Sequence, residues 1–213
     1  MKVLITGFQP FGGESINPSY EAVKLLPDTI AGAQVIKADL SVVFGVAIDE
    51  LDGLIQKHDP DVVICTGQAG GRTHMSVERI GINCDDGRIP DNAGYQPKGA
   101  PTKADGPAAY FATIPIKAMV THMKKAGVPA EVSNTAGTYV CNHILYGCLY
   151  LLDKKYPGKR GGFIHVPYLP EQVLEKKNTA SMPMDLIAKG FEAAVEAAVL
   201  NEKDEETAAG AEH

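Results

Sequence analysis

Apolar positions along the chain fall into two patterns that alternate from the first residues to about residue 200. One pattern is a short unbroken run rich in β-branched residues, which is typical of a strand buried on both faces of a sheet. Five runs have this form: KVLITGF, AQVIKADL, DVVICTG, AEVSNT and GGFIHVP. We therefore expect five buried strands.

The other pattern is a longer amphipathic segment with apolar residues at helical spacing. It occurs in INPSYEAVKLLP, VFGVAIDELDGLIQKHDP, IPIKAMVTHMKKAG, YVCNHILYGCLYLLDKKYP and PMDLIAKGFEAAVEAAVL. Asn17 before Pro18 favours a helix start, and Pro60 and Gly127 favour helix ends. Strands that alternate with helices predict an α/β fold: one domain over residues 1–200, with a mostly parallel twisted sheet and helices on both faces, in three α/β/α layers.

Two regions depart from this alternation. Residues 67–105 are rich in Gly, Asp, Asn and Pro, with one short alternating stretch, MSVERIGIN. We expect an irregular excursion with a hairpin there, serving as a lid or an oligomer contact. Residues 201–213, NEKDEETAAGAEH, are charged and small, which predicts a flexible tail.

Composition excludes several classes of protein. The net charge of −6 disfavours a nucleic-acid partner, since phosphate binding needs a basic surface. No apolar run reaches the roughly 18 residues of a membrane span. The four cysteines form no CxxC pair, and the Cys and His positions lack the paired spacing of zinc sites. These features favour a cytoplasmic protein with free thiols and no metal.

Candidate chemistry follows the predicted strands, because ligands bind beyond the carboxyl ends of strands in such sheets. GFQPFGG follows the first strand, GQAGGRTH the third, and AGTYVCNH the fourth, while His165 ends the fifth. We therefore expect the Cys141 thiol and the His165 imidazole at the same edge of the sheet.

The cysteines differ in their surroundings. Cys65 lies inside an apolar strand and Cys148 on an apolar helix face, so both are expected in the core; Cys84 cannot be placed. Cys141 lies in a helix's first turn, where the positive end of the helix lowers a thiol's pKa and free N–H groups can stabilise an oxyanion. Position alone leaves a nucleophile and an inert core thiol both open.

The residues alone also leave open which side chains would act together with this thiol. His165 is either a general base or a satisfied core histidine. His143 lies two residues from Cys141, about 200° around the helix, and is therefore disfavoured. Glu78 could orient the imidazole as the third member of a triad, or could be a solvated carboxylate paired with Arg79.

Long motifs in a fixed order now identify a resemblance. LITGFQPFGGESINPS, ICTGQAGGRTHMSVERIGIN, GRIPDNAGYQP, SNTAGTYVCNHILYG and FIHVPYLPEQ resemble the pyroglutamyl-peptidase I family of cysteine peptidases over nearly the whole chain. The resemblance implies a triad of Glu78, Cys141 and His165 that removes N-terminal pyroglutamyl residues from peptides. Gly81 departs from the family, which more often has Ala there, without affecting the triad.

The resemblance also implies a substrate pocket. Phe8 and Phe11 would enclose the pyroglutamyl ring, Asn17 and Gln68 would contact the lactam, and Arg88 would lie near the scissile carbonyl. The alternatives are core aromatic residues, a helix cap for Asn17, a turn for Gln68 and an exposed loop residue for Arg88. The resemblance further implies no cofactor and a homo-oligomer such as a tetramer.

The sequence leaves two alternative functions open. The glycines of GFQPFGG and GQAGGR could cradle an anion in a phosphate-dependent transferase, although neither stretch matches GxGxxG or a P-loop. A binding module for modified peptide ends would carry the same pocket without turnover. Both rivals are separable from a peptidase by an activity assay.

Overall fold

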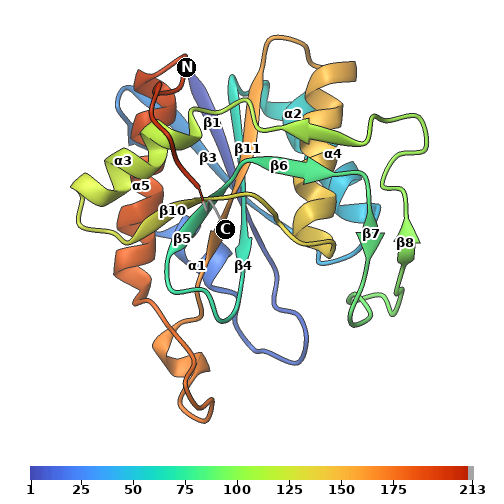
Figure 1. Ribbon diagram of the computed structural model, residues 1–213. Coiled ribbons are helices and arrows are strands. Elements are labelled where there is room, and N and C mark those ends of the chain that lie inside the picture. Colours follow the sequence, from blue (N-terminus) through green and yellow to red (C-terminus); the bar gives the residue numbers. More distant parts are fainter. Residues whose placement is uncertain (211–213) are drawn as a thin grey trace.

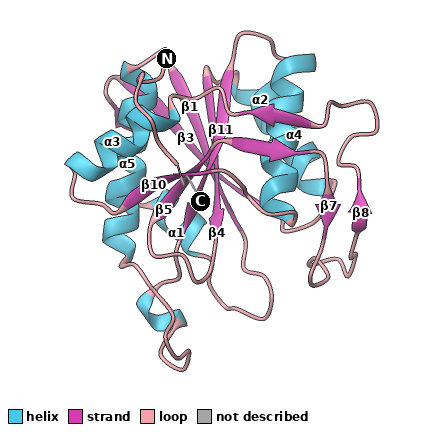
Figure 2. Ribbon diagram, in the orientation of Figure 1, coloured by secondary structure: helices cyan, strands magenta, loops and turns pink. Residues whose placement is uncertain are grey.

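Seven strands form the central sheet of the computed structural model, which describes residues 1–210. Their order across the sheet is β10-β5-β11-β4-β1-β3-β2 (Figures 1 and 2). The strands are β1 (Lys2–Phe8), β2 (Thr29–Ile30), β3 (Ala33–Leu40), β4 (Val62–Gln68), β5 (Met75–Glu78), β10 (Ala130–Ser133) and β11 (Arg160–Val166).

Helices cover both faces of this sheet, so the predicted three-layer α/β/α fold is confirmed. One face packs against α1 (Pro18–Lys24), α3 (Ile116–Lys125) and α5 (Met184–Leu200), and the other against α2 (Val46–His58) and α4 (Val140–Lys154) (Figure 1). A short 3₁₀ helix, η1 (Pro170–Gln172), follows β11. No helix of residues 1–210 is long and apolar enough to cross a membrane.

The central sheet is mostly parallel, as expected, but it includes a short strand, β5, that the apolar pattern did not predict. β1, β3, β4 and β11 are parallel neighbours, but β5 pairs antiparallel with β11, and β10 is parallel to β5. The stretch MSVERIGIN is divided between two sheets: its first half is β5, and its second half, β6 (Ile80–Ile82), leaves the central sheet to pair with β9 (Ala109–Phe111). Local pattern missed this because β5 is only four residues long and is paired by strands distant in sequence.

The remaining strands lie outside the central sheet on the α4 side. β7 (Asp85–Asp86) and β8 (Lys98–Ala100) pair in a second two-stranded sheet. Residues 67–105 therefore contain β5, β6 and this antiparallel pair of consecutive strands, which is the expected hairpin. The role of the region as a lid or oligomer contact stays a prediction.

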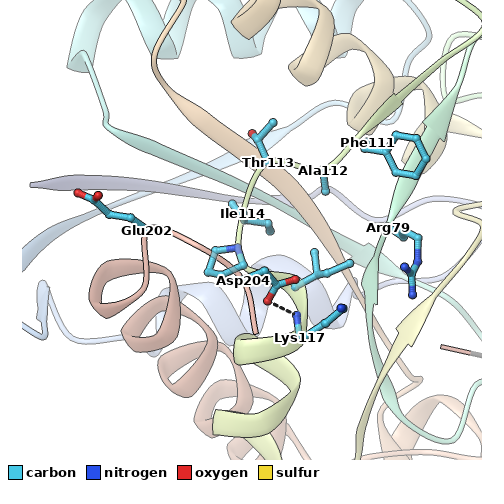
Figure 3. A pocket seen from close by; sticks show the side chains of 10 residues that line it. Arg79, Phe111, Ala112, Thr113, Ile114, Lys117, Glu202 and Asp204 are labelled. Atoms are coloured by element: carbon cyan, nitrogen blue, oxygen red, sulfur yellow. Dashed lines mark hydrogen bonds between the residues drawn. The ribbon is translucent and has the colours of Figure 1, made fainter. Parts of the chain in front are cut away.

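The charged tail makes specific contacts in the part that the structure describes. At the amino end of α3, where Pro115 offers no side-chain cap, Asp204 accepts hydrogen bonds from the backbone N–H groups of Lys117 (2.9 Å, Figure 3) and Ala118 (3.0 Å). Glu205 accepts a bond from Thr121. The predicted flexibility of residues 201–213 stays a prediction, and its last three residues lie outside the described range.

Replacing Asp204 by Ala should destabilise the fold, because α3 loses its only side-chain cap among the described residues. We expect a loss of about 1 kcal/mol, typical of a helix cap, and a melting temperature about 2–4 °C lower. Thermal unfolding followed by circular dichroism measures the shift. Glu206→Ala, at an exposed neighbour, is the matched control; equal effects of the two changes would contradict the capping role.

Candidate active site

Side chains at the ends of three neighbouring strands point to the α4 side of the sheet. On β11, Phe163 belongs to the core cluster on that side, so His165, two residues on, faces the same way. Gly67 of β4 is the register partner of His165. A Cβ atom on Gly67 would lie 2.8 Å from the Sγ of Cys141. The absence of a side chain at Gly67 thus leaves room for the Cys141 thiol at this edge.

Cys141 reaches this edge by a longer route than the sequence suggested. Because β10 runs antiparallel to β4 and β11, its carboxyl end points away from their carboxyl edge. Residues 134–139 therefore return the chain to the start of α4. The expectation that Cys141 and His165 share an edge is confirmed, but the argument from the direction of β10 was wrong.

Antiparallel pairing brings Glu78 to His165. Glu78 is opposite Phe163 in the register, and His165 is its diagonal neighbour on the same face. The Nδ1 of His165 lies 2.7 Å from the Oε1 of Glu78, with both side chains buried. A carboxylate only accepts, so Nδ1 carries the proton and donates it. The free Nε2 is left as a proton acceptor.

Arg72 is a site residue that sequence reasoning missed. Its Nη1 donates to the Oε1 of Glu78 at 2.7 Å, and its Nη2 donates to the backbone carbonyl of Thr135 at 3.0 Å. Arg79, the partner considered from sequence, instead bonds Asn134 and the carbonyl of Ala209. The only sequence signal for Arg72 is its place in the glycine-rich loop after β4.

The amino end of α4 supplies free donors. Its capping position, Tyr139, makes no side-chain cap bond, and Cys141 is the second helical residue. The N–H groups of the first turn therefore have no intrahelical partner. Cys141 and His165 line one cleft of about 400 Å³, although no hydrogen bond joins the thiol to the imidazole within residues 1–210.

Burial controls the protonation of this group. Burial raises the pKa of the Cys141 thiol to about 12, reinforced by the charge of Glu78 and opposed by Arg72. Burial lowers the pKa of His165, and the charge of Arg72 lowers it further; together they outweigh the hydrogen bond and charge of Glu78, which raise it. Burial raises the pKa of Glu78, but its bond to His165 and the charges of His165 and Arg72 outweigh this and lower it. The lowered thiol pKa expected from helix position is wrong, because burial of Cys141 prevails.

The predicted pocket residues do gather beside the thiol. Phe8, Phe11, Asn17, Gln68 and Cys141 line one narrow hollow, together with Val42, Tyr139 and Val140. Its free volume is only about 10 Å³, so a ring enters only after a side chain moves. Phe11 is partly exposed, which makes it the side chain best placed to move.

Arg88 lies in the adjoining cleft rather than in this hollow. It lines that cleft with Arg72, Tyr168 and His165. Arg88 is exposed. The positive charge that lowers the pKa values of Cys141 and His165 is that of Arg72.

The two predicted polar contacts have different surroundings. Asn17 caps α1: its Oδ1 accepts from the N–H and hydroxyl of Ser19, and its Nδ2 donates to the carbonyl of Gln9. The Oε1 of Gln68 accepts from Gln172 at 2.9 Å, which leaves the amide N–H groups of Gln68 toward the hollow.

Cys65, Cys148 and His143 are structural, whereas Cys84 is partly exposed. Cys65 and Cys148 are fully buried in the core, as expected, and their mutual contact together with burial holds the pKa of Cys148 well above its usual range. His143 lies between Asp85 and the backbone N–H of Gly45, each at 2.8 Å, so both ring nitrogens are occupied. No cluster of three or more potential metal ligands exists within residues 1–210.

Known proteins resemble this chain in sequence and in structure. The family model for pyroglutamyl peptidase matches residues 1–201. A pyrrolidone-carboxylate peptidase of Clostridium perfringens is 56% identical over 211 residues, 99% of each chain. One of Thermosipho africanus is 54% identical over 205 residues, 96% of this chain and 100% of the other.

Solved structures of pyroglutamyl peptidases also match this chain. The crystal structure of the pyroglutamyl peptidase I from Bacillus amyloliquefaciens matches with a TM-score of 0.95 and 48% identity, covering 97% of this chain and 99% of that one. A mutant pyrrolidone carboxyl peptidase from Pyrococcus furiosus matches with a TM-score of 0.90 and 41% identity, covering 94% and 99%.

A thiol, an imidazole and a buried carboxylate gathered at one edge of a sheet are groups that cysteine hydrolases use, and the chain belongs to this class. Within this class, the chain belongs to the pyroglutamyl peptidase family.

Removing the negative charge of Glu78 and removing the positive charge of Arg72 should shift the pKa of His165 in opposite directions. To act as a base His165 must be neutral, so we expect activity to fall as pH drops through the pKa of His165. Glu78→Gln removes a charge that raises this pKa, and Arg72→Met removes one that lowers it. The acid limb of kcat/KM should move to lower pH in the first variant and to higher pH in the second, by roughly one pH unit each.

The pH profile of kcat/KM measures both shifts. Arg79→Met is the control, because Arg79 adjoins Glu78 in sequence but bonds Asn134 instead; its acid limb should stay in place. Shifts of the same sign in Glu78→Gln and Arg72→Met would contradict the electrostatic account of this site.

Proposed function

We propose that the protein removes N-terminal pyroglutamyl residues from peptides through a triad of Cys141, His165 and Glu78. The observation that carries the proposal is the buried 2.7 Å bond between His165 and Glu78, beside the cleft that His165 shares with Cys141. Membership of the pyroglutamyl peptidase family supports the substrate.

Both reacting groups start neutral in this mechanism. The high pKa of Cys141 and the lowered pKa of His165 favour thiol and imidazole over an ion pair. The Nε2 of His165 takes the thiol proton as Sγ attacks the pyroglutamyl carbonyl. The new oxyanion accepts hydrogen bonds from the free N–H groups at the start of α4, including that of Cys141.

The second half of the reaction reverses these roles. The protonated His165 gives its proton to the leaving amine as the C–N bond breaks, and a thioester to Cys141 remains. Water, deprotonated by His165, attacks this thioester and releases pyroglutamate and the free thiol. Glu78 stabilises the imidazolium in both halves, and Arg72 keeps Glu78 charged and in place.

The substrate occupies the two adjoining cavities once the hollow has opened. The lactam ring enters between Phe8 and Phe11, and the amide N–H of Gln68 donates to the lactam carbonyl. Asn17 has one N–H left for a further contact, since its other polar groups are used in capping. The peptide beyond the scissile bond occupies the larger cleft, where Arg88 lies near the reacting bond.

Cellular setting and assembly belong to the same proposal. The four cysteines are free, which supports a reducing compartment such as the cytoplasm. The proposed homo-oligomer, such as a tetramer, agrees with the exposed apolar side chains of Phe111 and Tyr95 outside the central sheet.

Cys141→Ser should abolish turnover, by about 10³-fold or more, and leave the fold intact, because a hydroxyl in this setting is a far weaker nucleophile. Release of the chromophore from a pyroglutamyl amide measures turnover, and circular dichroism checks the fold. Cys148→Ser is the control: it places a hydroxyl in an apolar core and should lower the melting temperature while turnover persists.

The same assay tests the rival functions. An active Cys141→Ser variant would overturn the proposed nucleophile. Turnover that needs inorganic phosphate would favour a transferase, and binding of pyroglutamyl peptides without turnover would favour a binding module.

The pocket should also discriminate by charge. Pyroglutamyl amides are neutral, whereas prolyl and glutaminyl amides would bring an ammonium against Phe8 and Phe11, with no carboxylate lining the hollow. Burying an unpaired charge costs several kcal/mol, so kcat/KM should be lower by about 10³-fold or more. Comparable rates on prolyl and pyroglutamyl amides would contradict this pocket.

A further inference from the structure

Gln172 is a buried polar residue that the mechanism does not use. It ends η1, after β11, and its side chain is held at both ends. Its Oε1 accepts a hydrogen bond from the backbone N–H of Leu169 at 2.9 Å. Because a backbone N–H can only donate, this bond fixes which end of the Gln172 amide is the oxygen.

The other end of Gln172 faces acceptors alone. Its Nε2 lies 2.9 Å from the Oε1 of Gln68, and 3.4 Å from both the carbonyl of Ile16 and the Oε2 of Glu14. A backbone carbonyl only accepts, so this side confirms the same orientation. Fixed backbone groups therefore set the direction of the Gln172 amide from both sides.

The orientation of the Gln172 amide in turn fixes the orientation of the Gln68 amide. Its Oε1 is occupied by Gln172, so its amide nitrogen is the polar group left for a ligand. That nitrogen makes no hydrogen bond within residues 1–210 and is not sealed from the cavity, since the only buried polar side-chain atoms without partners there are those of Thr6 and Glu78. Gln68 lines both the hollow and the cleft.

We propose that Gln172 is the positioning residue that sets the substrate specificity of the hollow, by holding Gln68 with its N–H donors toward the ring. A donor there matches a ring carbonyl and repels a ring or terminal amine. The inference rests on the proposed function and explains how an amide, which could present either end, recognises a lactam.

Gln172→Glu tests this with almost no change in shape. A carboxylate still accepts from Leu169 but cannot donate to Gln68, so Gln68 turns its N–H groups to residue 172 and its oxygen to the hollow. Two neutral substrates with the same leaving group report the result: a pyroglutamyl amide, and a cyclopentanecarbonyl amide that lacks the lactam groups. Their ratio of kcat/KM should fall roughly ten- to a hundredfold, mainly through KM for the pyroglutamyl amide.

Gln56→Glu, the same chemical change on an exposed face of α2, is the matched control and should leave the ratio unchanged. Glu14→Gln combined with Gln172→Glu removes the repulsion between the two carboxylates and should retain the low ratio. Gln172→Met frees Gln68 without turning it and should lower the ratio by a smaller factor, about two- to fivefold. If Gln172→Glu fails to fold, the ratio of kcat/KM measured for Gln172→Met tests the proposal instead.

The outcomes separate the two proposals. An unchanged ratio in folded Gln172→Glu or Gln172→Met, with both substrates slowed equally, would show a structural role only and overturn the inference while the proposed function stands. A wild-type protein that cleaves neither amide would overturn the proposed function and the inference with it.

Discussion

The antiparallel pairing of β5 with β11 is the constraint on which the candidate site depends. It makes Glu78 the diagonal neighbour of His165. A slip of one residue would turn Glu78 to the opposite face, among the apolar side chains that surround Met75 and Val77. An unpaired carboxylate there would cost several kcal/mol. The hydrophobic pattern that fixes the register of β5 thereby also fixes the geometry of the imidazole.

A second constraint is space at the carboxyl end of β4. Gly67 leaves the volume that the Cys141 sulfur occupies, so the thiol lies against the sheet and is desolvated. Desolvation is what keeps the thiol neutral despite the helix end behind it. In the proposed mechanism the thiol and the imidazole start neutral, and His165, held by Glu78 and Arg72, accepts the thiol proton only as the sulfur attacks.

The sequence predicted the long elements well, because their apolar patterns are strong and local. All five buried runs and all five amphipathic segments are strands and helices of the structure. β5 was missed as a sheet member because its partners are distant in sequence. Arg72 and Gln172 were missed for the same reason: each acts through side-chain bonds, to Glu78 and to Gln68, that no local pattern encodes. The thiol pKa was misjudged because position in a helix does not report burial.

Chemistry and recognition at this site are organised by one principle, the direction of hydrogen bonds. Arg72, held by the carbonyl of Thr135, binds Glu78, and Glu78 leaves His165 with an acceptor toward the cleft. On the recognition side, the N–H of Leu169 orients Gln172, and Gln172 leaves Gln68 with a donor toward the hollow. Each of these two series of hydrogen bonds starts at a backbone group: the carbonyl of Thr135, which can only accept, or the N–H of Leu169, which can only donate. The site therefore needs no ligand to fix which of these groups accept and which donate, and the rearrangement that the narrow hollow requires for binding is the movement of an apolar side chain such as Phe11.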